Sequence, residues 1–226
     1  MTLVIDVDLT DAPAVDRAAA MAAGALLTGD LVVFPTETVY GIACRPDDAW
    51  ATARLFDAKR RPRGLNLPVL AATAEAALSL ADAPEAAGAL AAALWPGALT
   101  LVLRRAAGSA AWDLGDEAAT IGVRVPDFPL TRSVLERTGP LGVTSANRSG
   151  HPPAGDRDAL VRAFGESVAV YLVADRSALG GTPSTVLDLS DAPRARILRA
   201  GSVSRARIDE VLASSGGVLQ WVDSPS

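Results

Sequence analysis

Cysteine, histidine and aromatic residues are scarce in this chain of 226 residues. The single cysteine, Cys44, excludes an internal disulfide, and its apolar surroundings favour a small buried side chain over a catalytic thiol. Aromatic residues make up only 4 % of the chain, so stacking platforms for single-stranded nucleic acid are few. The net charge of −5 argues against nonspecific nucleic-acid binding through a basic face.

Long apolar runs and the common short motifs for nucleotides and metals are also missing. The apolar stretch 83–94 contains Pro84, Glu85 and Gly88 and is too short to span a bilayer. The acidic N-terminus lacks the features of a signal peptide, so we expect a cytoplasmic protein. Neither a P-loop nor a G-x-G-x-x-G motif occurs. Without H-E-x-x-H or C-x-x-C, we expect no metal bound by protein side chains.

Apolar strands and Ala-rich amphipathic helices alternate along the chain, which predicts an α/β fold with a mixed, twisted sheet. Strands are expected at 31–34, 39–44, 67–71, 98–103, 120–125, 141–144, 168–173, 184–189 and 195–199. Helices are expected at 14–27, from 47 onward, and at 74–81, 85–94, 130–137, 156–164 and 204–212. No linker or repeat divides the chain, so one domain over 1–214 is predicted, with a frayed tail at 215–226.

The stretch 31–70 holds the strongest functional pattern. An apolar strand leads into Pro35-Thr36-Glu37-Thr38, and a helical segment leads into the basic cluster Lys59-Arg60-Arg61-Pro62-Arg63. Because like charges repel, four cations crowded together in an acidic chain suggest a site for an anion. The alternative is a solvated helix end, where Lys and Arg complement the helix dipole.

Small hydroxyls, amides and Arg residues recur at the ends of predicted strands, where ligands bind in open α/β sheets. They are Thr36, Thr38, Thr120, Arg124, Ser145, Asn147, Ser184, Thr185 and Arg199. Each also has a structural explanation: Ser145 and Asn147 can form a turn, and Arg124 can pair with a carboxylate such as Asp127. Together with the basic cluster, these side chains suit a phosphorylated ligand.

Several strings resemble, in order, the YrdC-like family of threonylcarbamoyl-AMP synthases. They are PTETVYG with K-x-R-P at 59–62, WPGALTLVL (95–103), TIGVRVPDFP (120–129), VTSANRSG (143–150), PSTVLDL (183–189) and ILRAG (197–201). Any one string is a weak signal, but together they cover residues 15–212. The resemblance implies a YrdC-like open, twisted sheet with flanking helices and a concave ligand-binding face.

The resemblance also implies roles for individual residues. Lys59 and Arg61, the catalytic candidates, match an element that binds nucleotide phosphates, and Ser145 and Asn147 match an S-x-N element at the same site. Thr120 and Arg199 match nucleotide-contacting positions. Around the amino acid we expect Thr38, Arg124 and Ser184, which match the family, with Thr36 beside them.

As a nucleotidyltransferase, such a protein would use L-threonine, bicarbonate or CO₂, and ATP to make threonylcarbamoyl-AMP and pyrophosphate. Mg²⁺ would arrive with the nucleotide. The product would serve the threonylcarbamoyladenosine (t6A) modification of tRNA, with downstream threonylcarbamoyl transferase proteins as partners. Two rival functions stay open: a carbamoyl-adenylate-forming domain with another acceptor, and a non-enzymatic RNA-binding or ribosome-maturation protein.

The sequence departs from the family near the amino acid. Leu70 stands about where many members have a His, and His151 lies in another loop and is no obvious substitute. This leaves the strictness of threonine selection open. The Gly- and Pro-rich segment 148–156 is expected to be a mobile loop that covers the nucleotide.

Overall fold

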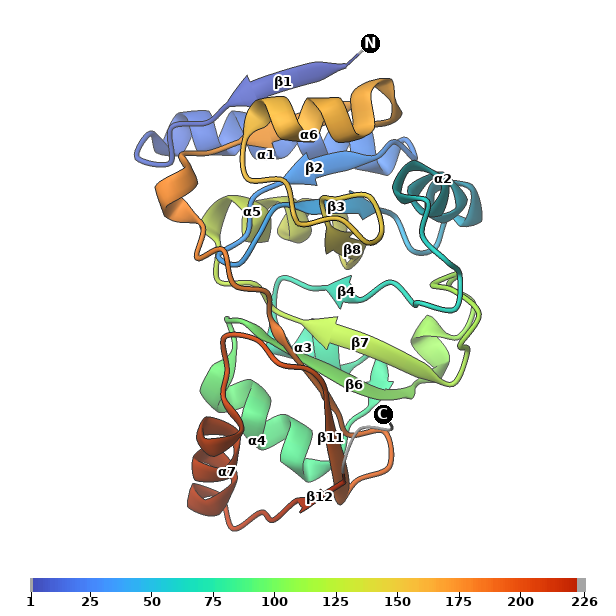
Figure 1. Ribbon diagram of the computed structural model, residues 1–226, viewed down its shortest axis with the longest axis vertical. Helices are drawn as coiled ribbons and strands as arrows, with labels where there is room; N and C mark the ends of the chain where they lie inside the picture. Colours follow the sequence, from blue (N-terminus) through green and yellow to red (C-terminus); the bar gives the residue numbers. More distant parts are fainter. Residues whose placement is uncertain (1, 223–226) are drawn as a thin grey trace.

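A twelve-stranded mixed sheet runs through the computed structural model, which describes residues 2–222 (Figure 1). The strand order is β1-β9-β2-β3-β8-β4-β7-β6-β10-β11-β12, with β5 paired to β6. The sheet contains parallel pairs such as β1–β9 and β4–β7 and antiparallel pairs such as β3–β8 and β6–β7. The predicted mixed α/β sheet is therefore confirmed.

The strands are β1 Leu3–Asp6, β2 Val32–Phe34, β3 Gly41–Cys44, β4 Val69–Leu70, β5 Ala81–Asp82, β6 Leu99–Arg105, β7 Thr120–Arg124, β8 Leu141–Ser145, β9 Val170–Val173, β10 Thr185–Asp188, β11 Arg194–Arg199 and β12 Gln220–Trp221. The helices are α1 Ala12–Leu27, α2 Ala49–Lys59, α3 Ala74–Leu78, α4 Glu85–Leu94, α5 Pro129–Thr138, α6 Arg157–Phe164 and α7 Arg205–Ser214. Short 3₁₀ turns lie at Ala107–Ser109, Gly165–Ser167 and Arg176–Ala178.

Hydrophobic cores cover both faces of the sheet. In β2, Val33 packs into one core while Val32 and Phe34 pack into the other, as the alternation of a doubly buried strand requires. The core that contains Val32 is closed by α1 and α5, which pack on each other. The opposite core extends under α2, α3, α4 and α7, and α4 and α7 lie side by side at one end of the molecule in Figure 1.

The strands that sequence periodicity missed are short or terminal. The acidic N-terminus forms β1 and pairs with β9, and β5 is a two-residue strand at the edge of β6. Within the segment 215–226, for which a frayed tail is predicted, β12 pairs with β11, and Trp221 donates to Asp209 Oδ1 at 2.8 Å. Residues 223–226 of the predicted tail lie outside the described residues. No helix between residues 2 and 222 is long and apolar enough to cross a membrane.

The two-residue strand β4 lies in the middle of the sheet, between β8 and β7. It pairs antiparallel to β8 and parallel to β7, with Leu70 opposite both Leu141 and Arg124. The chain on either side of β4 leaves the ladder, so the sheet is narrow at this point. Functional side chains from the strands on both sides meet here.

Candidate active site

A cavity of about 300 Å³ lies against the middle of the sheet. Its walls come from the β2–β3 turn, β4, β6, β7, β8 and the segments before β10 and at the end of β11. Lining residues include Thr36, Thr38, Leu70, Thr100, Arg124, Ser145, Asn147, His151, Ser184 and Arg199. Most of the predicted site residues are thus brought together; outside this lining are Lys59, Arg61, Thr120 and Thr185, whose hydroxyl donates to Val203 O.

The Thr36-Glu37-Thr38 turn presents buried hydroxyls at the cavity wall. Thr36 Oγ1 lies 2.8 Å from Thr38 Oγ1 and donates to Val39 O at 2.6 Å. The same oxygen accepts from the Val39 amide at 3.2 Å, so the turn is closed by its own side chain. Thr131 holds the turn from α5 through a hydrogen bond to Pro35 O. The Thr38 hydroxyl is thereby fixed toward β7.

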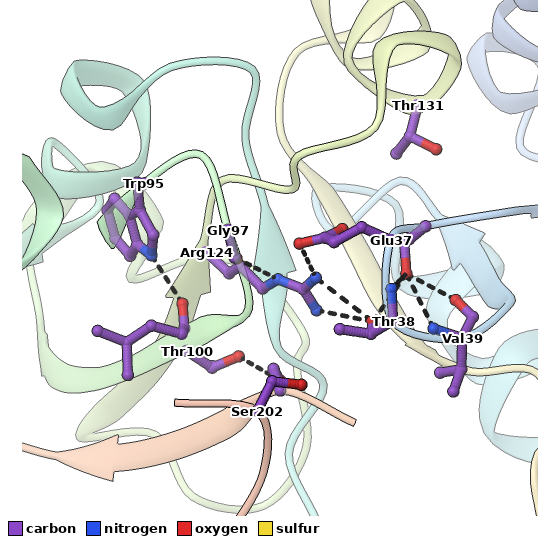
Figure 2. A network of polar contacts seen from close by, with 12 residues as sticks. Glu37, Thr38, Val39, Trp95, Gly97, Thr100, Arg124, Thr131 and Ser202 are labelled. Atoms are coloured by element: carbon purple, nitrogen blue, oxygen red, sulfur yellow. Dashed lines mark hydrogen bonds and ion pairs between the residues drawn. The ribbon is translucent and has the colours of Figure 1, made fainter. Parts of the chain in front are cut away.

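Arg124, at the end of β7, is held by this turn (Figure 2). Its Nη2 lies 2.5 Å from Glu37 Oε1, both Nη atoms lie 3.3 Å from Thr38 Oγ1, and Nε donates to Gly97 O at 2.9 Å. Arg124 therefore does pair with a carboxylate, as the structural alternative allowed, but the carboxylate is Glu37 and not the Asp127 named as an example. Glu37 Oε2 is buried without a hydrogen-bond partner. Much of the guanidinium is therefore engaged inside the protein, although Arg124 still lines the cavity.

Ser184 and Arg199 form the opposite wall. The Ser184 hydroxyl lies 2.9 Å from Thr100 Oγ1 on β6, and Arg199 donates to both the carbonyl and the hydroxyl of Ser184. The turn after β11 packs against this wall, with the backbone of Gly201 directly beside Pro183. A side chain at position 201 would not fit, since its Cβ would lie 2.4 Å from Pro183 O. Only glycine allows so close a backbone approach. Ser184 and Arg199 are consequently fixed relative to each other.

Lys59 is the only lysine in the chain and its side chain is buried, with 1 % exposed. Helix α2 begins at Asp48, which caps the amides of Trp50 and Ala51, and delivers Lys59 at its last position. Its Nζ donates to Ser145 O at 2.5 Å and Asn147 O at 2.6 Å. Burial, and to a smaller extent repulsion from Arg61, lower the pKa of Lys59 to about 7. A neutral amine satisfies both carbonyls with two N–H groups; an ammonium has a third to give to an anion.

Arg61 extends a row of neighbouring cations. It donates to Leu65 O at 2.8 Å and Asn66 O at 3.0 Å, just before β4. Burial lowers the pKa of Arg61, and repulsion from Arg199 lowers it as well. Burial also lowers the pKa of Arg199, together with repulsion from Arg124. Lys59, Arg61, Arg199 and Arg124 therefore follow one another in space. Of the ion pairs within residues 2–222, none involves Lys59, Arg61 or Arg199.

Thr120 lies at the opposite end of β7 from Arg124. Four residue steps along a strand span about 13 Å, and even spacing places both side chains on one face. Because β4 runs parallel to β7, with Val69 opposite Val123, the Leu65–Asn66 segment held by Arg61 lies toward the Thr120 end. The face of the sheet that carries the Thr120 and Arg124 side chains therefore has two ends. Arg61 and Thr120 lie at one end, and Arg124 and Thr38 lie at the other.

The β8–α6 loop passes in front of β3 in Figure 1, and its residues Asn147, His151 and Pro153 line the cavity. Two backbone hydrogen bonds connect the loop to its surroundings. The amide of Ser149 donates to Lys59 O at 2.9 Å, and the amide of Ala154 donates to Ala146 O at 3.2 Å. Asn147 Nδ2 donates to His151 O at 2.6 Å. His151 and Leu70 both line the cavity, although they belong to separate segments.

We expect hydrogen exchange in the loop 148–156 to slow when ATP and threonine bind together. The loop is exposed and tied by few backbone bonds, so it opens at low cost without ligand. Exchange mass spectrometry with and without saturating ligands measures the effect, with the exposed β10–β11 turn as an internal control. Unchanged exchange at saturation would show that the loop does not close over ligand.

Some contributors were not found from the sequence. Glu37, Thr100 and His151 were absent from the predicted site, because strand and loop patterns do not reveal which side chains meet across the sheet. One available signal was the solitary lysine in a chain rich in arginine. The arrangement itself combines uncompensated cations with fixed hydroxyls, which can bind an extended anion. No Asp or Glu lines the cavity, and residues 2–222 hold no cluster of three metal-ligating side chains.

Comparisons with known proteins identify relatives of this chain. Residues 24–201 match the Sua5/YciO/YrdC family model, which is described as "Telomere recombination". A Mycobacterium tuberculosis protein with the provisional name threonylcarbamoyl-AMP synthase is 42 % identical over 213 residues, covering 94 % of this chain and 97 % of its own. The threonylcarbamoyl-AMP synthase of Bacillus subtilis is 32 % identical, covering 91 % of this chain and 60 % of its own.

A solved structure is similar over nearly the whole chain. Pyrococcus abyssi Sua5 in complex with L-threonine superposes with a TM-score of 0.81 at 30 % identity, covering 98 % of this chain and 63 % of that one. The chain thus spans less than two thirds of that longer protein. The matches in sequence and in structure extend over the same strands that build the cavity, and this chain belongs to the Sua5/YciO/YrdC family.

Proposed function

We propose that this protein is a threonylcarbamoyl-AMP synthase, which joins L-threonine, CO₂ or bicarbonate, and ATP. The observation that carries the proposal is the row of cations beside a hydroxyl-lined cavity. In this row Lys59, Arg61 and Arg199 have no carboxylate partner within residues 2–222. An extended polyanion compensates such a row. The names of the relatives and the threonine complex of P. abyssi Sua5 support the same substrates.

One end of the site binds the nucleotide and the other end binds the amino acid. Lys59, Arg61, Thr120, Ser145, Asn147 and Arg199 bind the nucleotide, and Thr36, Thr38, Arg124 and Ser184 surround the amino acid. The threonine amine and CO₂ form a carbamate, whose oxygen attacks the α-phosphorus of ATP. The P–O bond to the β-phosphate breaks and pyrophosphate leaves. No protein nucleophile is needed, because the site holds two anions in line and offsets the charge on the leaving group.

Mg²⁺ enters this scheme with ATP. The cavity wall has no carboxylate, so the residues present fit an ion held by phosphates and water. Bound there, Mg²⁺ would neutralise phosphate charge. We place the reaction in the cytoplasm, with the product passing to the threonylcarbamoyl transferase proteins that modify tRNA. Any direct binding of RNA is expected to be weak, since many exposed Arg residues within residues 2–222 are paired with acids.

Incubation with ATP, bicarbonate and labelled threonine, without RNA, tests the proposal. Formation of labelled threonylcarbamoyl-AMP together with pyrophosphate is the expected result. Pyrophosphate release that is independent of threonine but depends on another acceptor would favour a different carbamoyl-adenylate enzyme. Absence of product with each acceptor, together with RNA binding, would favour a non-enzymatic protein.

We expect threonine to be preferred over serine and valine by only about 10–200-fold in kcat/KM, because an apolar wall discriminates poorly between near-isosteres. Leu70 lines the cavity beside Pro68 and Val143 and offers no hydrogen bond to a substrate hydroxyl. Competition assays with the three amino acids measure the ratios, and Leu70→His is the matched variant, expected to widen the gap to valine. Discrimination above about 10⁴-fold in the wild type would instead require a polar contact to the hydroxyl.

A further inference from the structure

Among the described residues that line the cavity, only one side chain has a basic nitrogen that is neither permanently charged nor bound to the protein; the amine of Lys59 lies outside the lining and donates to two carbonyls. No carboxylate lines the cavity, and the guanidinium groups of Arg124 and Arg199 are permanently charged. The Tyr40 hydroxyl is committed to Ala174 O at 3.0 Å, and burial raises the pKa of Tyr40. His151, the only histidine in the chain, is the remaining candidate, since a neutral imidazole has a free nitrogen lone pair.

The backbone of His151 is hydrogen-bonded only within its own loop, and its ring is free. The amide of His151 donates to Arg148 O at 3.0 Å, and its carbonyl accepts from Asn147 Nδ2 at 2.6 Å. Within residues 2–222 the imidazole forms no hydrogen bond or ion pair. The residue is exposed at the mouth of the cavity, so its ring can contact both a ligand and bulk water.

The electrostatics of the cavity favour loss of a proton from an amine substrate. The charged groups around His151 are Arg124 and Arg199 across the cavity, and Arg148 and Arg162 in the adjoining hollow. An ammonium among these cations is repelled, whereas a carbamate anion is attracted. Converting one into the other requires a group that carries the proton away.

We propose that His151 is a catalytic base that accepts a proton from the ammonium of the amino-acid substrate, an inference that rests on the proposed function. The imidazole takes one proton, and the freed nitrogen lone pair attacks the carbon of CO₂. An N–C bond forms, one C–O π pair moves to oxygen, and the second nitrogen proton leaves to water. The product is the carbamate anion, and His151 returns its proton to solvent at the cavity mouth.

The test compares His151→Gln, which keeps a polar side chain but not the base, with the wild type. We expect kcat/KM for threonine to fall about 10²-fold, the lower end of the range for general base catalysis. The Kd for a non-hydrolysable ATP analogue should stay within about twofold, because the nucleotide residues are unchanged. Added imidazole should restore at least about tenfold of the lost activity in His151→Ala, since the open mouth admits it.

Pro152→Ala is the matched control, because it alters the same loop at a residue outside the main cavity. It should retain wild-type kcat/KM for threonine. An equal loss in Pro152→Ala, without imidazole rescue of His151→Ala, would make the effect one of loop structure and overturn the proposal. So would wild-type kcat/KM in His151→Gln. A wild type that makes no threonylcarbamoyl-AMP would instead refute the proposed function.

Discussion

Replacing Lys59 with methionine is expected to lower kcat/KM for ATP by about 10²–10³-fold, the cost of removing one preorganised donor from a charged transition state. Lys59 acts at two levels. Its Nζ holds Ser145 O and Asn147 O, which fixes the turn at the cavity wall, and its third N–H in the ammonium form faces no carboxylate partner. Methionine has a similar length but leaves both carbonyls without this donor.

The same change should reduce the free energy of unfolding by about 2–4 kcal/mol, because two buried carbonyls lose their donor. The protein should still fold, since this is less than the usual total stability. Arg61→Gln is expected to cause a comparable loss of activity with a smaller loss of stability, as its acceptors lie in a partly exposed loop.

Arg60→Gln provides the control for both variants. Arg60 lies between Lys59 and Arg61 and is exposed. Its own backbone has the left-handed conformation that ends helix α2. Pyrophosphate release measured with saturating threonine, and urea denaturation, give the two readouts. Wild-type release by both Lys59→Met and Arg61→Gln would mean that the basic cluster is a solvated helix end.

Much of the fold was accessible from the sequence because the central strands are short apolar runs bounded by turns. The hydrophobic segments at 31–34, 120–125 and 141–144 became β2, β7 and β8 with boundaries within a residue or two. Strand order was not accessible by this reasoning, since β4 lies between β8 and β7, far from its neighbours in sequence. Pairing across such distances depends on tertiary packing and leaves no local periodicity.

The site was only partly predictable for a related reason. Residue type at strand ends identified Thr38, Arg124, Ser184 and Arg199, because their hydroxyl and guanidinium groups are unusual beside apolar strands. What each one contacts depends on the turn geometry. The Glu37 side chain folds back onto Arg124, and the nearer-seeming Asp127 does not pair with it. The sequence likewise could not show that Lys59 would face two backbone carbonyls.

Arg124→Lys is expected to raise the KM for threonine about 10²-fold while leaving the KM for ATP within about threefold. The guanidinium binds Gly97 O, Thr38 Oγ1 and Glu37 Oε1 at once, and Nη1 uses only one of its two hydrogens for Thr38. A planar fork can hold this frame and still offer a donor to a carboxylate at the cavity wall. Lysine, a single point charge, cannot reproduce those contacts together.

The structural and catalytic parts of this loss are separable through Glu37. Breaking the pair leaves the Glu37 carboxylate largely buried with one oxygen already unpartnered, at a cost of about 3 kcal/mol in the free energy of unfolding. Glu37→Gln combined with Arg124→Gln removes both buried charges and should recover most of the stability. Because the fork is still missing, the high KM for threonine should remain. If Arg124→Lys keeps its threonine affinity but loses ATP affinity, the amino acid binds at the Arg61–Thr120 end of the face.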